Sequence, residues 1–162
     1  MSFRIICLCF FSLIASSVIG REIQKFDKAA FYAAMSSGNL EEVNKELDAI
    51  SSSSASNKEG YEGALLMCKA SLVKGAAEKL KCFKAGRIKF EAAVQSDTDN
   101  AEYRFLRFAI QEHAPKIVKY NKDLQADKLF IIKEYKNLAP VVQRAILDYT
   151  KKSKILNAQD LA

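Results

Sequence analysis

Glycine and proline are scarce in this chain, with six Gly and two Pro among 162 residues. A β-sandwich or β-barrel needs many tight turns, which these two residues commonly supply, so the composition argues against both architectures. Lys, Glu, Ala and Leu dominate instead, and these residues favour helix. The composition therefore predicts an all-α protein.

Histidine is nearly absent as well, since His113 is the only one in the chain. A Ser-His-Asp triad, or a histidine acting as general base, needs an orienting carboxylate, and Glu112 is expected to point elsewhere on a helix. Gly-rich phosphate loops, G-x-S-x-G elbows and H-E-x-x-H helices are missing from the sequence. We therefore predict that the protein is not an enzyme, and we predict no catalytic, cofactor-binding or metal-binding residues. His113 is interpreted as a solvated residue at a helix C-terminus.

The chain also lacks a hydrophobic run long enough to span a membrane. Its longest apolar segment is residues 5–14, about half of the roughly 20 residues that a spanning helix needs. Arg4 precedes this segment and small residues follow it, which is the layout of a cleaved export signal. We predict a signal peptide over residues 1–20, cleaved after Gly20 or alternatively after Ser17. The mature protein is then secreted or periplasmic and has no membrane span.

Basic residues exceed acidic ones, 25 against 19, which gives the full chain a net charge of +6. The excess is concentrated in the C-terminal third, but its lysines are scattered among acidic residues at helical spacing. A basic surface can attract nucleic acid, anionic lipid or an acidic protein. Because the lysines form no sustained cluster and the protein is expected to be exported, we interpret them as a solvated face and predict no nucleic-acid partner.

Apolar residues recur at helical spacing over residues 21–162, which predicts one helical domain of about seven helices. Gly38 is expected to end the first helix, and Asn39 to cap the second with Glu42 as its capping-box partner. Residues 51–57, SSSSASN, are the only low-complexity segment. Serine side chains compete with the backbone for hydrogen bonds, so this segment is predicted to be a mobile connector.

Two further helices are expected over residues 58–73 and 76–94, and Asp99 is expected to cap the next helix, with Glu102 in the reciprocal position. Pro115 and Pro140 each stand where a new helix can begin, because proline is tolerated in the first turn. A long helix is expected between the two prolines, and a last helix after Pro140.

Every second predicted helix begins near residue 23, 60, 100 or 140, a period of roughly 37–40 residues that is typical of two-helix repeats. The segment 90–111, FEAAVQSDTDNAEYRFLRFAIQ, resembles a tetratricopeptide junction. In that family an alanine-bearing helix, a turn and an aromatic-rich helix follow one another. The usual proline in the turn is missing here, and no strict 34-residue consensus repeats. The resemblance implies antiparallel hairpins stacked in a short tetratricopeptide-like array.

The segments KCFKAGRIKFEAAV and YRFLRFAIQEHAPKIVKY also resemble small exported proteins of unknown function from Bacteroidetes-type bacteria. This second resemblance implies a helical fold and an exported location, and it supplies no site.

Cys68 and Cys82 are the two cysteines outside residues 1–20, and they lie seven residues either side of Gly75. In one continuous helix their Cα atoms would be about 21 Å apart, whereas a disulfide needs about 4.4–6.8 Å. A chain reversal at Gly75 would bring them within reach. Two interpretations stay open, a disulfide or two free buried thiols. The spacing is too wide for a redox-active C-x-x-C pair.

The aromatic-rich helix after Asn100 offers a candidate partner-binding face. Three of its aromatic residues are expected to face the core: Tyr103, Phe105 and Phe108. The opposite face then carries Arg104, Arg107 and Gln111, which could line the groove of a helical array. We therefore predict a non-enzymatic exported adaptor or scaffold that binds a protein or peptide. The alternative is a helical carrier of a small apolar ligand in the periplasm.

Overall fold

The computed structural model describes residues 26–162, so the predicted signal peptide lies outside the described residues. This part of the chain contains seven α-helices and three short 3-10 helices, and no strand occurs within it. The all-α prediction is confirmed. The elements in chain order are α1 (Lys28–Ser37), α2 (Leu40–Ser52), α3 (Lys58–Leu72), α4 (Ala76–Ser96), α5 (Ala101–His113), η1 (Lys116–Val118), α6 (Leu124–Glu134), η2 (Tyr135–Asn137), α7 (Pro140–Thr150) and η3 (Ala158–Leu161).

The turn between α1 and α2 forms as the sequence predicts, with one difference. Gly38 ends α1 in the left-handed conformation, with φ of 65°, which glycine adopts without steric cost. The Asn39 side chain accepts hydrogen bonds from the Glu41 and Glu42 N–H groups, at 2.8 and 3.4 Å. The Asn39 N–H donates to Ser37 Oγ at 3.0 Å, so the serine takes the place expected for the Glu42 side chain.

The turn before α5 corrects another predicted cap. Asn100 rather than Asp99 is the N-cap, and its side chain accepts a hydrogen bond from the Tyr103 N–H at 3.0 Å. Asn100 keeps an extended backbone, so α5 begins one residue later than the Asp99 cap implies. Glu102 is buried, and its carboxylate accepts hydrogen bonds from Lys28 Nζ at 2.5 Å and Tyr32 Oη at 2.9 Å. It therefore joins α5 to α1 instead of completing a capping box.

Three other predicted boundaries shift. The Ser-rich segment is partly helical, because α2 continues to Ser52, and Ser53 is buried with its hydroxyl donating to the Ile50 carbonyl. Pro115 opens only a single 3-10 turn, whereas Pro140 begins α7 as predicted. The long helix expected between the prolines is α6 followed by the 3-10 turn η2.

The hairpin of α3 and α4 is the most closely packed pair of helices. The chain reverses at Gly75, whose φ is 83°. A Cβ atom on Gly63 would lie 2.6 Å from the Phe90 backbone nitrogen, and one on Gly86 would lie 2.5 Å from the Gly63 carbonyl oxygen. These two glycines therefore allow the backbones of the two helices to touch.

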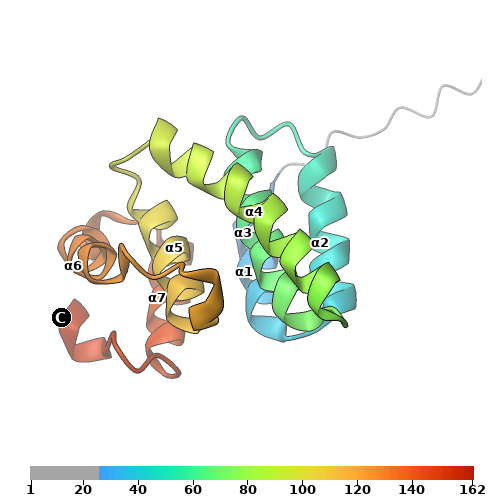
Figure 1. Cartoon of the computed structure of the whole chain (residues 1–162). Coiled ribbons are helices and arrows are strands. Elements are labelled where there is room, and N and C mark those ends of the chain that lie inside the picture. Colours follow the sequence, from blue (N-terminus) through green and yellow to red (C-terminus); the bar gives the residue numbers. More distant parts are fainter. Residues whose placement is uncertain (1–25) are drawn as a thin grey trace, which may run out of the picture.

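The helices form two groups, shown blue to green and yellow to red in Figure 1: the N-terminal group α1–α4 and the C-terminal group α5–α7. The groups meet where α5 contacts α3 and α4, and where α7 contacts α1. Aromatic rings form part of this contact, since the Tyr103 ring lies 5.9 Å from that of Tyr61 and 6.1 Å from that of Phe90. In the described part of the chain, none of the helices is long and apolar enough to cross a membrane.

Candidate functional site

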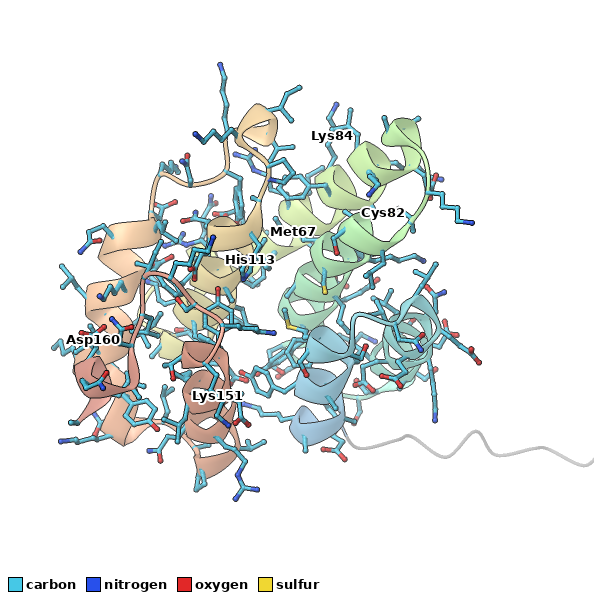
Figure 2. All side chains as sticks on the ribbon, turned by 90° about the horizontal axis from the view of Figure 1, so that it is seen from below. Met67, Cys82, Lys84, His113, Lys151 and Asp160 are labelled. Carbon is cyan, nitrogen blue, oxygen red and sulfur yellow. The ribbon has the colours of Figure 1, made fainter. Side chains whose placement is uncertain are left out.

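A cleft with a volume of about 1410 Å³ lies between the N-terminal and C-terminal groups. Residues of α1, α3 and α4 line one side of it, and residues of α5, η1 and α7 line the other. Figure 2 shows representatives of both sides: Met67 and Lys84 belong to the N-terminal group, and His113 and Lys151 to the C-terminal group. Asp160 lies on the far side of the C-terminal group, away from the cleft.

The floor of the cleft is apolar and ordered by packing. Met67 of α3, Phe83 of α4 and Phe105 of α5 line it, and each is less than a tenth exposed. The Phe105 ring is held edge-on against that of Tyr149, with centroids 5.6 Å apart. Because these side chains belong to three helices that also form the core, the floor is preformed.

Two large apolar side chains at the cleft are exposed to solvent. Leu80 of α4 is 45% exposed and Ile117 of η1 is 88% exposed. Exposed single hydrophobic residues are common on protein surfaces, but a concave surface that continues into an apolar floor is typical of a binding site. These two residues therefore extend the apolar surface from the buried floor to the edges of the cleft.

The rim of the cleft is basic. Six cationic side chains line the cleft, three on the α4 side and three on and after α7: Lys79, Lys84, Arg87, Arg144, Lys151 and Lys152. The only carboxylate among the lining residues is Asp148, which already accepts a hydrogen bond from Lys151 at 2.6 Å. The folded chain thus gathers cations that form no cluster in the sequence. A concentration of one charge sign at a cleft attracts ligands of the opposite sign.

A polar cluster lies at the C-terminal end of α5, where Glu112 and His113 both contact Tyr149. Tyr149 Oη donates to Glu112 at 2.6 Å and lies 3.2 Å from His113 Nε2. Ser153 Oγ and the Lys154 N–H also donate to the Glu112 carboxylate, each at 2.7 Å. The expectation that Glu112 and His113 point apart on the helix is therefore wrong, since both reach the same hydroxyl.

The Glu112 carboxylate joins α5 to the segment after α7. Burial raises its pKa, but the hydrogen bonds from Tyr149, Ser153 and the Lys154 N–H outweigh burial, so the pKa lies below its usual range. Burial and the hydrogen bond to Glu112 raise the pKa of Tyr149. The carboxylate is thus charged and fully occupied by neighbouring donors. This arrangement stabilises the backbone after α7.

The predicted partner-binding face of α5 is covered by α6. Arg107 makes two hydrogen bonds to the Asp127 carboxylate, from Nε at 2.6 Å and from Nη2 at 2.7 Å. Arg104 donates to the same carboxylate at 3.0 Å and to the Thr98 carbonyl. Gln111 is 2% exposed. The interpretation of Arg104, Arg107 and Gln111 as a surface for a partner is therefore replaced by an internal ion-pair cluster.

Asp127 is the ion-pair partner of Arg104 and Arg107 that the sequence does not reveal. It is fully buried in α6 and forms ion pairs with two guanidinium groups of α5. Arg107 has two longer contacts as well, to Glu91 at 3.7 Å and Asp123 at 3.9 Å. Its one sequence signal is its position four residues before Ile131, which is also fully buried, so both lie on the same helix face. A carboxylate on the buried face of a helix requires a cationic partner.

Cys68 and Cys82 are free thiols in the structure, so the disulfide alternative is not formed. The chain does reverse at Gly75, but the two thiols have different neighbours. Cys68 Sγ donates to the Met35 carbonyl of α1 at 3.6 Å, and Cys82 Sγ donates to Glu78 of its own helix at 3.7 Å. Only Cys68 lines the cleft, and burial raises the pKa of both thiols. Within residues 26–162, no group of three or more His, Cys, Asp or Glu side chains is placed to hold a metal ion.

Comparison of the chain with protein-family models, with curated proteins and with solved structures finds no match. The resemblance to tetratricopeptide repeats and to small exported proteins therefore stays a prediction.

Proposed function

We propose that the protein is an exported, non-enzymatic adaptor that binds a peptide segment of a partner protein in the cleft between its two helical groups. The observation that carries this proposal is the cleft itself. Its volume is about 1410 Å³, its floor is apolar, and Leu80 and Ile117 extend the apolar surface into solvent. A preformed apolar surface of this kind gives a partner area to bury without a large ordering cost.

The size of the cleft favours a peptide helix over a single small molecule. Small-molecule pockets are typically about 300–1,000 Å³. A helix about 10 Å across that rises 1.5 Å per residue occupies about 120 Å³ per residue. A helix of about three turns therefore has a volume of the same order as the cleft. Amphipathic helices that lie in apolar grooves are a recurrent form of peptide recognition.

Site-specific photocrosslinking tests the adaptor proposal with a matched pair of positions. A photoreactive amino acid replaces Ile117, which lines the cleft, or Ile88, which is 74% exposed on α4 and does not line it. We expect a protein crosslink at position 117, with a single peptide of the partner attached, and none at position 88. Equal crosslinking at both positions, or none at position 117, would contradict the proposal.

A carrier of a small apolar ligand is the second candidate, favoured by the depth of the floor. Met67, Phe105 and Leu106 line the cleft and are each at most 4% exposed. Native mass spectrometry separates the two functions. A carrier retains a ligand of discrete mass after purification, whereas an adaptor for peptides does not.

N-terminal sequencing of the protein secreted by its host tests the export proposal. Cleavage after Gly20 gives a mature chain that begins at Arg21, and cleavage after Ser17 gives one that begins at Val18. A chain that retains residues 1–20 would contradict cleaved export.

A further inference from the structure

We infer that the cleft selects an acidic amphipathic helix, whose apolar face lies on the floor and whose carboxylates lie along both edges. This inference rests on the proposed function and specifies the chemistry of the partner. The six cations and single paired carboxylate that line the cleft provide the charge complementarity.

The distribution of the cations is the first argument for a helix with acidic residues on both flanks. Lys79, Lys84 and Arg87 line the cleft from α4, whereas Arg144, Lys151 and Lys152 line it from the α7 side. Both sets are exposed, and the apolar floor lies between the helices that carry them. An amphipathic helix presents polar residues on both sides of its apolar stripe, so acidic residues there would meet both sets.

Unpaired charge at the cleft is the second argument. Among residues 26–162, neither Lys84 nor Arg144 makes a hydrogen bond or an ion pair within the chain. Lys89, also on α4 but outside the cleft, is bound to Glu59 at 2.7 Å and Glu62 at 3.0 Å. Lys84 is therefore without a carboxylate partner at the cleft, and Arg144 has only the longer-range attraction of Asp148.

Geometry favours a peptide over a lipid anion. A fatty acid carries one carboxylate at one end of its chain, whereas the cations occupy two sides of a cleft of about 1410 Å³. A bilayer surface cannot enter a concave site to reach side chains as deep as Met67, which is 4% exposed. Several carboxylates spaced along a helix match two rows of cations more completely.

Binding of synthetic peptides to the purified protein tests the inference. The probe is an 18-residue amphipathic helix with a leucine stripe flanked by glutamates, and its matched control has glutamine at every glutamate position. Palmitate and vesicles of anionic phosphatidylglycerol are measured in the same titration. We expect the acidic peptide to bind at least tenfold more tightly than the glutamine peptide, and its affinity to fall as salt is raised.

Charge reversal locates the binding. Lys84→Glu changes a cation that lines the cleft, and Lys81→Glu changes one that lies three residues earlier on α4 and outside it. Lys84→Glu replaces an attractive contact with a repulsive one, so we expect its affinity for the acidic peptide to fall about fivefold or more. The affinity of Lys81→Glu for the same peptide should equal that of the wild type. Arg144→Glu is a second variant on the opposite side, and circular dichroism establishes that each variant is folded.

Each outcome decides between the claims. Equal affinity for the acidic and glutamine peptides overturns the acidic partner but keeps a helix in the cleft. Binding of palmitate or vesicles without any peptide overturns both the inference and the adaptor proposal, in favour of a lipid ligand. The inference is overturned if Lys84→Glu and Lys81→Glu lower the affinity for the acidic peptide equally. It is also overturned if none of the probes binds.

Discussion

Both helical groups have an apolar core, but they differ in the further contacts that join their helices. In the N-terminal group, α3 and α4 pack backbone against backbone at Gly63 and Gly86, and the core is filled by rings such as Phe31, Tyr61 and Phe90, each at most 1% exposed. In the C-terminal group, buried or half-buried carboxylates join the elements. Asp127 joins α6 to α5, and Glu112 joins α5 to the segment after α7.

This difference predicts different responses of the two groups to mutation and to pH. Apolar packing depends on shape and changes little with protonation, whereas a carboxylate that is paired in the folded state makes stability depend on pH. The cleft lies between the groups, so one of its walls belongs to the group with close backbone packing and the other to the group joined by carboxylates. Substitutions in one group alone should therefore differ in how the resulting loss of stability depends on pH.

The largest expected effect is that of Asp127→Ala in the C-terminal group. It leaves Arg107, which is 7% exposed, without its bidentate partner and with only the longer contacts to Glu91 at 3.7 Å and Asp123 at 3.9 Å. Removing one member of a buried ion pair costs about 3–5 kcal/mol because the other charge stays buried. Urea denaturation measures the loss, and hydrogen exchange should show α6 losing protection before α3 and α4.

Asp148→Ala is the matched control for this prediction. Its carboxylate pairs with Lys151 on the surface, where both side chains are more than half exposed, and exposed pairs contribute little to stability. We expect no measurable change. If Asp127→Ala and Asp148→Ala lower the free energy of unfolding equally, the buried ion pair stabilises the C-terminal group no more than the exposed one does.

Gly86→Ala tests the N-terminal group and should have the next largest effect. The added Cβ would lie 2.5 Å from the Gly63 carbonyl oxygen, so α3 and α4 must separate. Overpacking of this kind costs about 1–3 kcal/mol, measured by thermal or urea denaturation. Because no charge is changed, the loss should be the same at pH 7 and at pH 4.

Gly60→Ala provides the contrast for Gly86→Ala. A Cβ there meets the outer atoms of the Tyr103 ring at 2.8 Å rather than backbone. A side chain adjusts more readily than a helix backbone, so we expect a smaller loss than for Gly86→Ala. A larger loss would mean that the contact between the two groups is the more rigid part of the molecule.

Glu112→Gln should have a smaller effect that depends on pH. The pKa of Glu112 is lowered in the folded protein, so its contribution is complete above the unfolded pKa of about 4.3 and is lost as pH falls through the lower folded value. Hydrogen bonds to a charged group are worth about 1.5–3 kcal/mol, and the glutamine retains part of them. We expect a loss of about 1–2 kcal/mol at pH 7.

Urea denaturation of both proteins between pH 7 and pH 3 measures this dependence. The difference between wild type and Glu112→Gln should shrink as pH falls below about 4.3. A difference that stays constant over this range would show that the carboxylate charge does not stabilise the segment after α7.

The contrast between the groups also explains what the sequence could predict. Periodic apolar residues identify the helices, and local chemistry identifies their ends, as at Gly38 and Asn39, because these signals lie within a few residues of one another. The ion pairs of Asp127 cannot be found this way, because their members are 20 and 23 residues apart and the helix faces that meet depend on the fold. From the sequence alone, Arg104 and Arg107 are therefore expected on an open surface.

The cleft was missed for the same reason. Its basic rim combines residues of α4, such as Lys84, with residues on and after α7, such as Arg144 and Lys151, which are about 60 positions away in the sequence. A search for runs of lysine finds no cluster there. Only the packing of the N-terminal group against the C-terminal group brings these charges to one site.

A thiol reductant should have the smallest effect on stability, because the structure places two free thiols, Cys68 and Cys82, in the N-terminal group. A disulfide between Cys68 and Cys82 would close a loop of about 15 residues and add about 3 kcal/mol in the chain-entropy description. Dithiothreitol should therefore leave the urea midpoint unchanged, and thiol titration of the denatured, unreduced protein should find both thiols of the pair. A lower urea midpoint on reduction would show that a covalent link joins α3 to α4 in addition to the packing at Gly63 and Gly86.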